Sequence, residues 1–304
     1  MIVGSEGRTA RRLARLAGGA AALLGATAGL APAVGAQAGT DILVVPFSES
    51  GARVSVGRPV NVTARRGYDN QPAFTRDGAA VLFTSIREDA QADIWRVTVA
   101  GGAATRVTDT PESEYSATPL PEDPGFSVIR VERDSTQRLW RFDDRGGDAA
   151  LVLRALRPVG YHVWVGRATL GAFVLGAPNA LVLVDARTES ADTLARGITR
   201  ALARVPGRDA FTFVQAGGDT SWISEVDVRT RAIRRIAPAP AGEGYHAWTP
   251  GGRLVATDGT RLLLRVGDRW DVLADLAAYG VRDLSRLALS PRGDHLALVA
   301  ADVP

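Results

Sequence analysis

Gln71-Pro72-Ala73-Phe74-Thr75-Arg76-Asp77-Gly78 begins the stretch of sequence that decides the fold. Its Asp-Gly end tolerates the positive φ of a hairpin turn, and the β-rich run Val81-Leu82-Phe83-Thr84-Ser85 returns from that turn. After a polar loop, Asp93-Ile94-Trp95-Arg96-Val97-Thr98-Val99 alternates apolar and polar residues, which is typical of a half-buried strand. A Gly101-Gly102 turn then leads to Thr105-Arg106-Val107-Thr108. These roughly forty residues predict one four-stranded antiparallel unit.

Weaker copies of this unit recur along the chain. Each copy has an apolar residue just before a turn, at Phe74, Leu120, Trp164, Val205, Trp248 and Leu289. These residues are about 41 to 46 positions apart, the spacing of four-stranded propeller blades. A small sheet with two apolar faces must stack on copies of itself. The sequence therefore predicts an all-β chain folded as a six-bladed β-propeller with four antiparallel strands per blade.

The last repeat lacks its third and fourth strands, because the sequence stops soon after Val299. The missing strands have counterparts at the other end of the chain: residues 41–45 resemble residues 93–97, and residues 60–63 resemble residues 105–108. We expect these N-terminal strands to complete the last blade and close the ring, which removes exposed sheet edges. A β-sandwich, the competing interpretation, does not predict this match.

Residues 1–38 have the features of an export signal. Four arginines precede a weakly apolar run over residues 16–34, and Ala36-Gln37-Ala38 is a small-x-small cleavage pattern. An ordered helix or a membrane anchor is the alternative interpretation, and Arg11-Arg12 leaves a twin-arginine export route open. We expect cleavage near Ala38, a periplasmic or extracellular mature chain without membrane insertion, and a single propeller domain over residues 39–304.

The charge and the cysteine content limit the kinds of partner and of chemical site that we expect. The four arginines and one glutamate of residues 1–38 account for the whole formal charge of +3, so residues 39–304 carry a formal charge of zero. This balance gives no support for a nucleic-acid partner, which needs a clustered basic patch. The chain has no cysteine, which excludes disulfides, thiolate metal sites and a cysteine nucleophile. We expect a monomer.

The first repeat resembles that of TolB-like six-bladed β-propellers, a WD40-like repeat family. The likeness rests on the Pro72-Ala73-Phe74-Thr75-Arg76-Asp77-Gly78 turn, on Asp93-Ile94-Trp95 and on the closing Val107-Thr108. It extends, more weakly, over the chain from about residue 41 onward. It implies an exported propeller that acts as a binding scaffold or as a gating domain for hydrolases. TolB has a further α/β domain before its propeller, for which this sequence leaves no room, so we expect a stand-alone propeller.

The known catalytic motifs are not present. The three histidines form no His-x-x-x-His or His-Glu-x-x-His pattern, and no Gly-x-Ser-x-Gly turn or Asp-x-Asp-x-Asp-Gly calcium loop occurs. No cofactor is therefore predicted. A calcium ion held by scattered carboxylates at the channel mouth leaves no local motif, so that possibility stays open. It would require carboxylates such as Asp69, Glu114 and Glu243 to converge.

Tyrosines and histidines are the candidate binding residues. All five tyrosines fall between the outer strand of one repeat and the inner strand of the next, and two are followed by histidine. Such segments emerge on one face of a propeller and would ring the channel mouth. Tyrosine suits binding surfaces because it combines an apolar ring with a polar tip. The candidates are Tyr68, Asp69, Tyr115, Tyr161, His162, Tyr245, His246 and Tyr279. The alternative is that these side chains are structural plugs between blades.

We therefore expect an exported, non-enzymatic binding or scaffold propeller that engages a small-molecule ligand or a protein at this face. One alternative is a metal-dependent enzyme of the six-bladed hydrolase or lactonase type. Another is a regulatory subunit of a hydrolase encoded elsewhere. The residues alone do not separate these functions.

The metal question has a direct test in thermal melting of residues 39–304 with and without EDTA, and then with added calcium or zinc. A metal that binds only the folded state raises the melting temperature by mass action. The metal-free scaffold predicts no change with EDTA. A clear fall that one metal restores would favour the enzyme.

Overall fold

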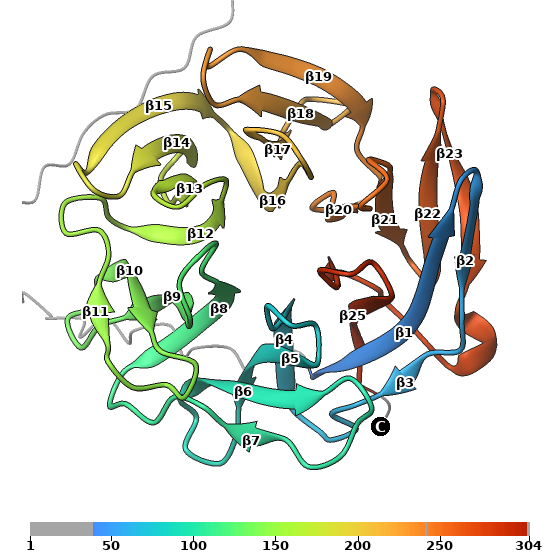
Figure 1. Cartoon of the computed structure of the whole chain (residues 1–304), viewed down its shortest axis with the longest axis horizontal. Helices are drawn as coiled ribbons and strands as arrows, with labels where there is room; N and C mark the ends of the chain where they lie inside the picture. The colour runs from blue at the N-terminus through green and yellow to red at the C-terminus, as the bar shows by residue number, and fades with distance from the viewer. Residues whose placement is uncertain (1–38, 241, 303–304) are drawn as a thin grey trace, which may run out of the picture. The chain divides into compact units, whose positions relative to one another are not determined.

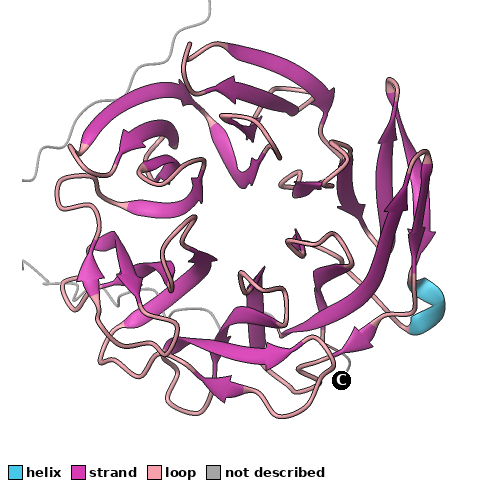
Figure 2. Ribbon diagram, in the orientation of Figure 1, coloured by secondary structure: helices cyan, strands magenta, loops and turns pink. Residues whose placement is uncertain are grey.

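Antiparallel strands make up almost all the regular structure in the computed structural model, which describes residues 39–240 and 242–302 (Figure 1 and Figure 2). The predicted export signal, residues 1–38, lies outside these residues. Within the described part of the chain, one short 3₁₀ helix occurs, η1 (Ala277–Tyr279). No helix of the described residues has the length and apolarity needed to cross a membrane.

Four sheets in the described residues contain four strands each, and in each sheet the strands lie side by side in chain order. The first comprises β8 (Ser113–Pro119), β9 (Phe126–Val131), β10 (Gln137–Phe142) and β11 (Ala150–Leu151). The second comprises β12 (Val159–Trp164), β13 (Thr169–Val174), β14 (Ala180–Asp185) and β15 (Ser190–Arg196). The third comprises β16 (Ile198–Arg204), β17 (Ala210–Gln215), β18 (Trp222–Asp227) and β19 (Ile233–Pro238). The fourth comprises β20 (His246–Trp248), β21 (Leu254–Asp258), β22 (Arg261–Val266) and β23 (Arg269–Asp275).

The remaining strands form one nine-stranded sheet with two recognisable halves. One half comprises β4 (Tyr68–Phe74), β5 (Ala80–Ile86), β6 (Ala92–Thr98) and β7 (Thr105–Arg106). The other comprises β24 (Leu287–Leu289), β25 (His295–Ala301) and β1 (Thr40–Ser50), with β2 (Arg53–Val56) and β3 (Val60–Asn61) both paired to β1. A single parallel bridge, between Thr40 and Tyr68, joins the halves. Every other strand pair is antiparallel, as the turn signals predict.

Strands from opposite ends of the described chain pair in this sheet. β1 and β25 run antiparallel from the Thr40 and Ala301 pair to the Pro46 and His295 pair. On its other edge, β1 pairs with the short β3 through Val44 and Val60. The two N-terminal segments that the sequence singled out are therefore hydrogen-bonded next to the C-terminal strand.

The apolar residues of β1 are buried on both faces of its sheet. Ile42 and Val44 pack in a cluster with Phe83 of β5, whereas Leu43 packs in a different cluster with Leu262 of β22. Successive side chains of a strand point to opposite faces, so one apolar run supplies two neighbouring cores. Strand β1 thereby links β4–β7 on one side to β20–β23 on the other.

The sheets are arranged around a common centre, with the first strand of each sheet innermost and the fourth outermost (Figure 1). Consecutive first strands contact one another from β12 through β16, β20 and β24 to β4 and β8. Side chains near the starts of these first strands therefore come from distant parts of the sequence to one central region.

A hairpin of β1 and β2 was not anticipated from the sequence. β1 continues past residue 45 to Ser50, and its end pairs with β2 from Phe47 and Val56 to Ser50 and Arg53. The tip contacts the turn between β20 and β21: Arg253 donates to the carbonyls of Gly51 and Ala52 and pairs with Glu49. The hairpin thus fastens the N-terminal strand to the neighbouring sheet.

Two matched valine substitutions test the role of β1. Val44 is 2% exposed in the core, whereas Val60 of the adjacent β3 is 50% exposed. We expect Val44→Ala to lower the free energy of unfolding by about 2 kcal/mol, and Val60→Ala by less than about 0.5 kcal/mol. Urea unfolding of residues 39–304 measures both values. Equal effects would contradict the buried pairing of β1.

Candidate binding site

Four of the five tyrosines line one cavity of about 610 Å³. Tyr68 begins β4, Tyr115 lies in β8, Tyr161 lies in β12, and Tyr245 directly precedes β20. β8 begins at Ser113 and β12 at Val159, so Tyr115 and Tyr161 each lie near the start of a first strand. There they pair with Ile129 and Phe173. The first strands surround the common centre, and this shared position brings the four rings together.

Tyr279 does not join them. It ends η1, which lies outside the sheets and is cyan in Figure 2, and its side chain is 51% exposed near the guanidinium of Arg58. The expectation that all five tyrosines surround one opening is therefore wrong for Tyr279. The linker before β24 is longer than the others, so the same residue type falls on the outside.

Two arginines complete the lining of the cavity. Arg286 directly precedes β24 and Arg200 lies in β16. The Arg286 guanidinium lies 4.8 Å from the ring centroid of Tyr161 and 4.5 Å from that of Tyr245, a cation–π arrangement with both rings. No aspartate or glutamate is among the residues that line this cavity. Its charged groups are therefore all cationic.

A chain of hydrogen bonds crosses between the sheets at this cavity. The Tyr161 hydroxyl accepts from Nη2 of Arg286 at 2.8 Å and from Nε2 of Gln71 at 3.4 Å. The amide oxygen of Gln71 accepts from the backbone N–H of Ser116 and from the Thr84 hydroxyl, both at 2.8 Å. These bonds fix the Gln71 amide and hold Tyr161 in place.

Irregular backbone positions Gln71 and Ser116. Each sits at a register shift in its first strand, with φ of +57° for Gln71 and +56° for Ser116. A non-glycine residue in this left-handed region costs about 1 kcal/mol or more and persists only where its surroundings hold it. Each bulge inserts an extra residue into its first strand, β4 or β8, beside the cavities.

The cavity keeps its phenols neutral. Burial raises the pKa of Tyr68 and Tyr115, and it raises the pKa of Tyr245 to about 12 although Arg286 opposes the shift. At neutral pH these hydroxyls therefore carry protons and remain hydrogen-bond donors.

A second, smaller cavity of about 150 Å³ shares Gln71, Tyr161, Arg200, Tyr245 and Arg286 with the first. These five side chains therefore lie at the junction of the two spaces. The second cavity is also lined by His162 and His246, and again by no carboxylate.

Both histidines also connect neighbouring sheets. Nε2 of His162 lies 2.7 Å from the hydroxyl of Ser127 in β9, and Nε1 of Trp164 donates to the same hydroxyl at 2.9 Å. His246 and Trp248 repeat this geometry on Thr212 of β17, at 2.7 and 3.0 Å. His-x-Trp is thus a repeated inter-sheet contact, which supports the structural-plug interpretation for the histidines.

Burial controls the ionisation of these histidines. It lowers the pKa of His162 to about 3 and that of His246 to about 4. Both rings are therefore neutral at pH 7. Nδ1 of His246 donates to the carbonyl of Gly244 at 2.8 Å, whereas Nδ1 of His162 is buried without a partner among the described residues.

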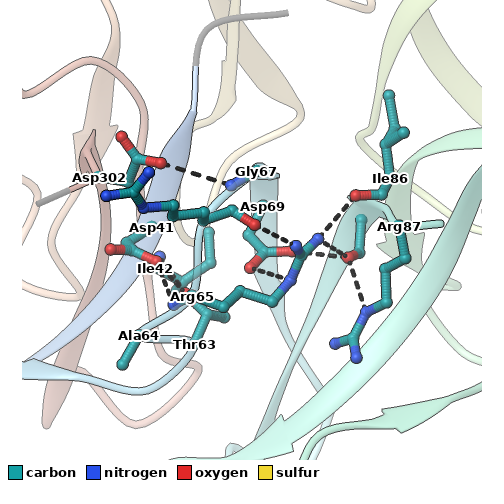
Figure 3. A network of polar contacts seen from close by, with 12 residues as sticks. Asp41, Ile42, Thr63, Ala64, Arg65, Gly67, Asp69, Ile86, Arg87 and Asp302 are labelled. Carbon is teal, nitrogen blue, oxygen red and sulfur yellow. Dashed lines mark hydrogen bonds and ion pairs between the residues drawn. The ribbon is translucent and has the colours of Figure 1, made fainter. Parts of the chain in front are cut away.

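Asp69 lies in a polar network of its own sheet, away from both cavities (Figure 3). It is fully buried, Oδ2 is 3.1 Å from Nε of Arg65, and Oδ1 accepts from the Ser85 hydroxyl at 2.6 Å. Arg65 also donates to the carbonyl of Ile86. Burial raises the pKa of Asp69, while Ser85 and Arg65 lower it. The structure thus engages this candidate in an internal ion pair.

The other two carboxylates of the enzyme alternative are engaged elsewhere. Glu114 is fully buried and accepts from Nε of Arg130 at 3.0 Å and from the Thr110 hydroxyl at 2.6 Å. Glu243 accepts from the backbone N–H of Arg200 at 3.3 Å. The described residues contain no group of three or more His, Asp or Glu side chains that could hold a metal. The convergence that this alternative requires is therefore not found in them.

Sequence reasoning missed Arg200, Arg286 and Gln71, although a signal for the arginines was present. Tyr161 and Tyr245 stand three residues before the repeat markers at 164 and 248, and Arg286 stands three before the marker at 289. Tyr115 and Arg200 each stand five before theirs, at 120 and 205. Counting back from each marker, instead of collecting one residue type, identifies the arginines.

The buried histidines predict a specific pH dependence of stability. The unfolded chain protonates each histidine near pH 6.5, but the folded chain does so only near the lowered pKa values, so stability falls as pH drops from about 6.5 toward 4. Each histidine contributes a slope of about 1.4 kcal/mol per pH unit. We expect His246→Gln to remove one such slope between about pH 6 and pH 5, measured by urea unfolding.

Thr212→Val is the matched control, because it removes the hydrogen bonds of the Thr212 hydroxyl to His246 and Trp248 without replacing His246. It should lower stability by about 1 to 3 kcal/mol while keeping the slope. An unchanged slope in His246→Gln would show that this histidine is not buried in the neutral form.

Comparisons with solved structures agree on the fold, although comparisons of sequence found no match. No protein-family model matches the sequence, and no curated protein has significant similarity to it. Among solved structures, a candidate TolB from Agrobacterium tumefaciens is similar with a TM-score of 0.63 and 16% identity, over 87% of this chain and 99% of that one. TolB from Acinetobacter baumannii gives 0.55 and 13%, over 87% and 64%. A structure of a nidogen/laminin complex gives 0.54 and 14%, over 79% and 90%. At these identities the likeness concerns the fold alone, and that fold is a TolB-like β-propeller.

Proposed function

We propose that this protein is an exported, six-bladed, non-enzymatic binding propeller that engages a ligand or a protein segment at the tyrosine-lined cavity. The observation that carries the proposal is the convergence of four tyrosines from separate repeats, with Arg200 and Arg286, on one cavity of about 610 Å³. This volume lies within the usual range for ligand pockets, and tyrosine and arginine are the residues most enriched at binding hot spots.

Six blades follow if the nine-stranded sheet is counted as two. Its halves are joined by the one bridge between Thr40 and Tyr68, and each half has the strand order of a single blade. Six core clusters in the described residues support this count, because each lies mainly between two neighbouring sheets and together they go once around the centre. In this interpretation, β1 and β3 complete the last blade and close the ring.

Export is supported by the sequence of residues 1–38, with its arginines, its apolar run and its small-x-small pattern at Ala36-Gln37-Ala38. The lack of cysteine in the chain suits an oxidising compartment as well as a reducing one, so it does not oppose export. We propose that the mature chain acts as a periplasmic or extracellular monomer.

The polar groups of the cavity face open space, whereas the carboxylates inside the sheets are paired with arginines. Asp69 and Glu114 are occupied by Arg65 and Arg130, whereas the cavity presents neutral phenols and cationic groups toward an open space. Gln71 and Arg286 hold the Tyr161 hydroxyl, and Arg286 also lies over the Tyr245 ring, so this part of the surface is preorganised. Preorganisation favours binding, because few side chains must be ordered when a ligand arrives.

A tyrosine comparison tests the proposed function. We expect Tyr161→Ala/Tyr245→Ala to weaken capture of ligand or partner by about tenfold or more, the scale of hot-spot residues. The readouts are a ligand-observed NMR screen of small molecules and an affinity capture from extracts of the source organism.

Tyr279→Ala is the matched control, since that ring lies on the outside of the sheets. It should retain binding within about twofold. The proposal fails if no captured molecule distinguishes the double variant from the wild type while both remain folded by circular dichroism.

A further inference from the structure

The two cavity arginines differ from three arginines that pair with buried carboxylates. Arg65, Arg106 and Arg130 each lie within 3.1 Å of a carboxylate oxygen that is almost fully buried. Within the described residues, Arg200 and Arg286 take part in no ion pair. Neither cavity is lined by a carboxylate; Glu243 lies nearby, but its carboxylate accepts from the backbone N–H of Arg200 and forms no ion pair with either guanidinium group.

Both arginines line both cavities, and their guanidinium groups offer hydrogen-bond donors in fixed directions. Arg286 is held between the rings of Tyr161 and Tyr245 and spends one N–H on the Tyr161 hydroxyl. A guanidinium has five N–H donors in a planar fork, so most of its donors remain available. Arg200 is exposed at the same junction. Burial raises the pKa of the nearby Tyr245, and the charges of Arg286 and Arg200 oppose that rise.

The Tyr161 hydroxyl adds a further donor. It already accepts from Arg286 and from Gln71, so both of its acceptor positions are used. Its own proton therefore has to go to an acceptor, and no described residue accepts it. An arrangement of two guanidinium groups and a hydroxyl proton is complementary to an oxyanion.

The rest of the larger cavity suits an organic body. Its wall includes Ile129, Val131 and Leu175 beside the tyrosine rings. It contains no helix N-terminus, the usual means by which backbone N–H groups hold a phosphate. Aromatic walls with two arginines where the two cavities meet favour a planar, bidentate anion on an apolar group.

We propose that this cavity binds a carboxylate whose two oxygens are held by Arg200 and Arg286 while its apolar, flat neighbour packs against Tyr68, Tyr115 and Tyr245. This inference rests on the proposed binding function and names the class of ligand for that site. The carboxylate belongs either to a free organic acid or to the end of a peptide chain.

Paired acids and amides test the charge assignment. The probes are 3-phenylpropanoate, as a free acid, and N-acetyl-glycyl-phenylalanine, as a chain end, each beside its primary amide. Calorimetry and ligand-observed NMR at low salt measure the dissociation constants. We expect at least one acid to bind about tenfold or more tightly than its amide, the effect of a charge-assisted hydrogen bond. Which acid binds identifies the source of the carboxylate.

Variants of the two cavity arginines test whether these side chains cause the difference in binding between acids and amides. Arg286→Gln and Arg200→Gln should each weaken acid binding by about tenfold, and Arg200→Gln should leave amide binding unchanged within about twofold. Because Arg286 also contacts two rings, Arg200→Gln is the variant that leaves the packing intact. Arg200→Lys should recover part of the loss, because a lysine keeps the charge without the planar fork. Arg231→Gln, at an exposed arginine paired with Asp192, should bind like the wild type.

Several outcomes would overturn the proposal. These are equal binding of acids and amides, acid binding that is insensitive to both arginine variants, tighter binding of phenyl phosphate than of either acid, and no acid binding at about 10 mM. If acid and amide bind equally and Tyr161→Ala/Tyr245→Ala abolishes both, only the carboxylate assignment fails. If the tyrosine double variant binds the acids normally, the cavity is not the site and the proposed function fails with it.

Discussion

Burial of both faces of every sheet is the constraint on which this structure depends. Strand β1 illustrates it, since Ile42 and Leu43 are adjacent in sequence but pack in separate cores. A four-stranded sheet of this kind gains little stability by itself, because one uncovered face leaves half of its apolar area in water. Each sheet is therefore stabilised by its two neighbours, and the arrangement around one centre gives every sheet two neighbours.

The fold was largely predictable because its signals are local. Turn residues such as Asp77 and Gly78, and the period-2 pattern of residues 93–99, act within one hairpin, and the corresponding strands form where expected. The hairpin partner β2 was missed although its pairing with β1 is local; the contact that fastens the tip of this hairpin joins Glu49 and Arg253, two residues about two hundred positions apart. A single-sequence pattern does not contain such a contact.

The candidate site was predictable in part. Residue type selected four tyrosines that line one cavity, because inner strands repeat at a regular spacing, but Tyr279 stands ten residues before its marker and falls elsewhere. His162 and His246 followed two of those tyrosines and looked equally suited to binding. The alternation of a strand turns each toward the preceding sheet, where Ser127 and Thr212 are their hydrogen-bond partners. The arginines were missed because a different residue type occupies the same register.

The pairing of β1 with β25 has a consequence for how the chain reaches this structure. Thr40 and Ala301 lie opposite each other in the β1–β25 pairing, although nearly the whole described chain lies between them in sequence. β2 and β3 are close to β1 in sequence, but the edge of β1 that faces β25, from Thr40 to Pro46, finds its partner only when β25 has been made, and closing so long a loop is slow. Until then this edge of β1 is unpaired and apolar, which favours association with other chains. The chain is therefore most prone to aggregate before β25 has been made. A chaperone that covers β1, a segment of about ten residues, would protect it during that time.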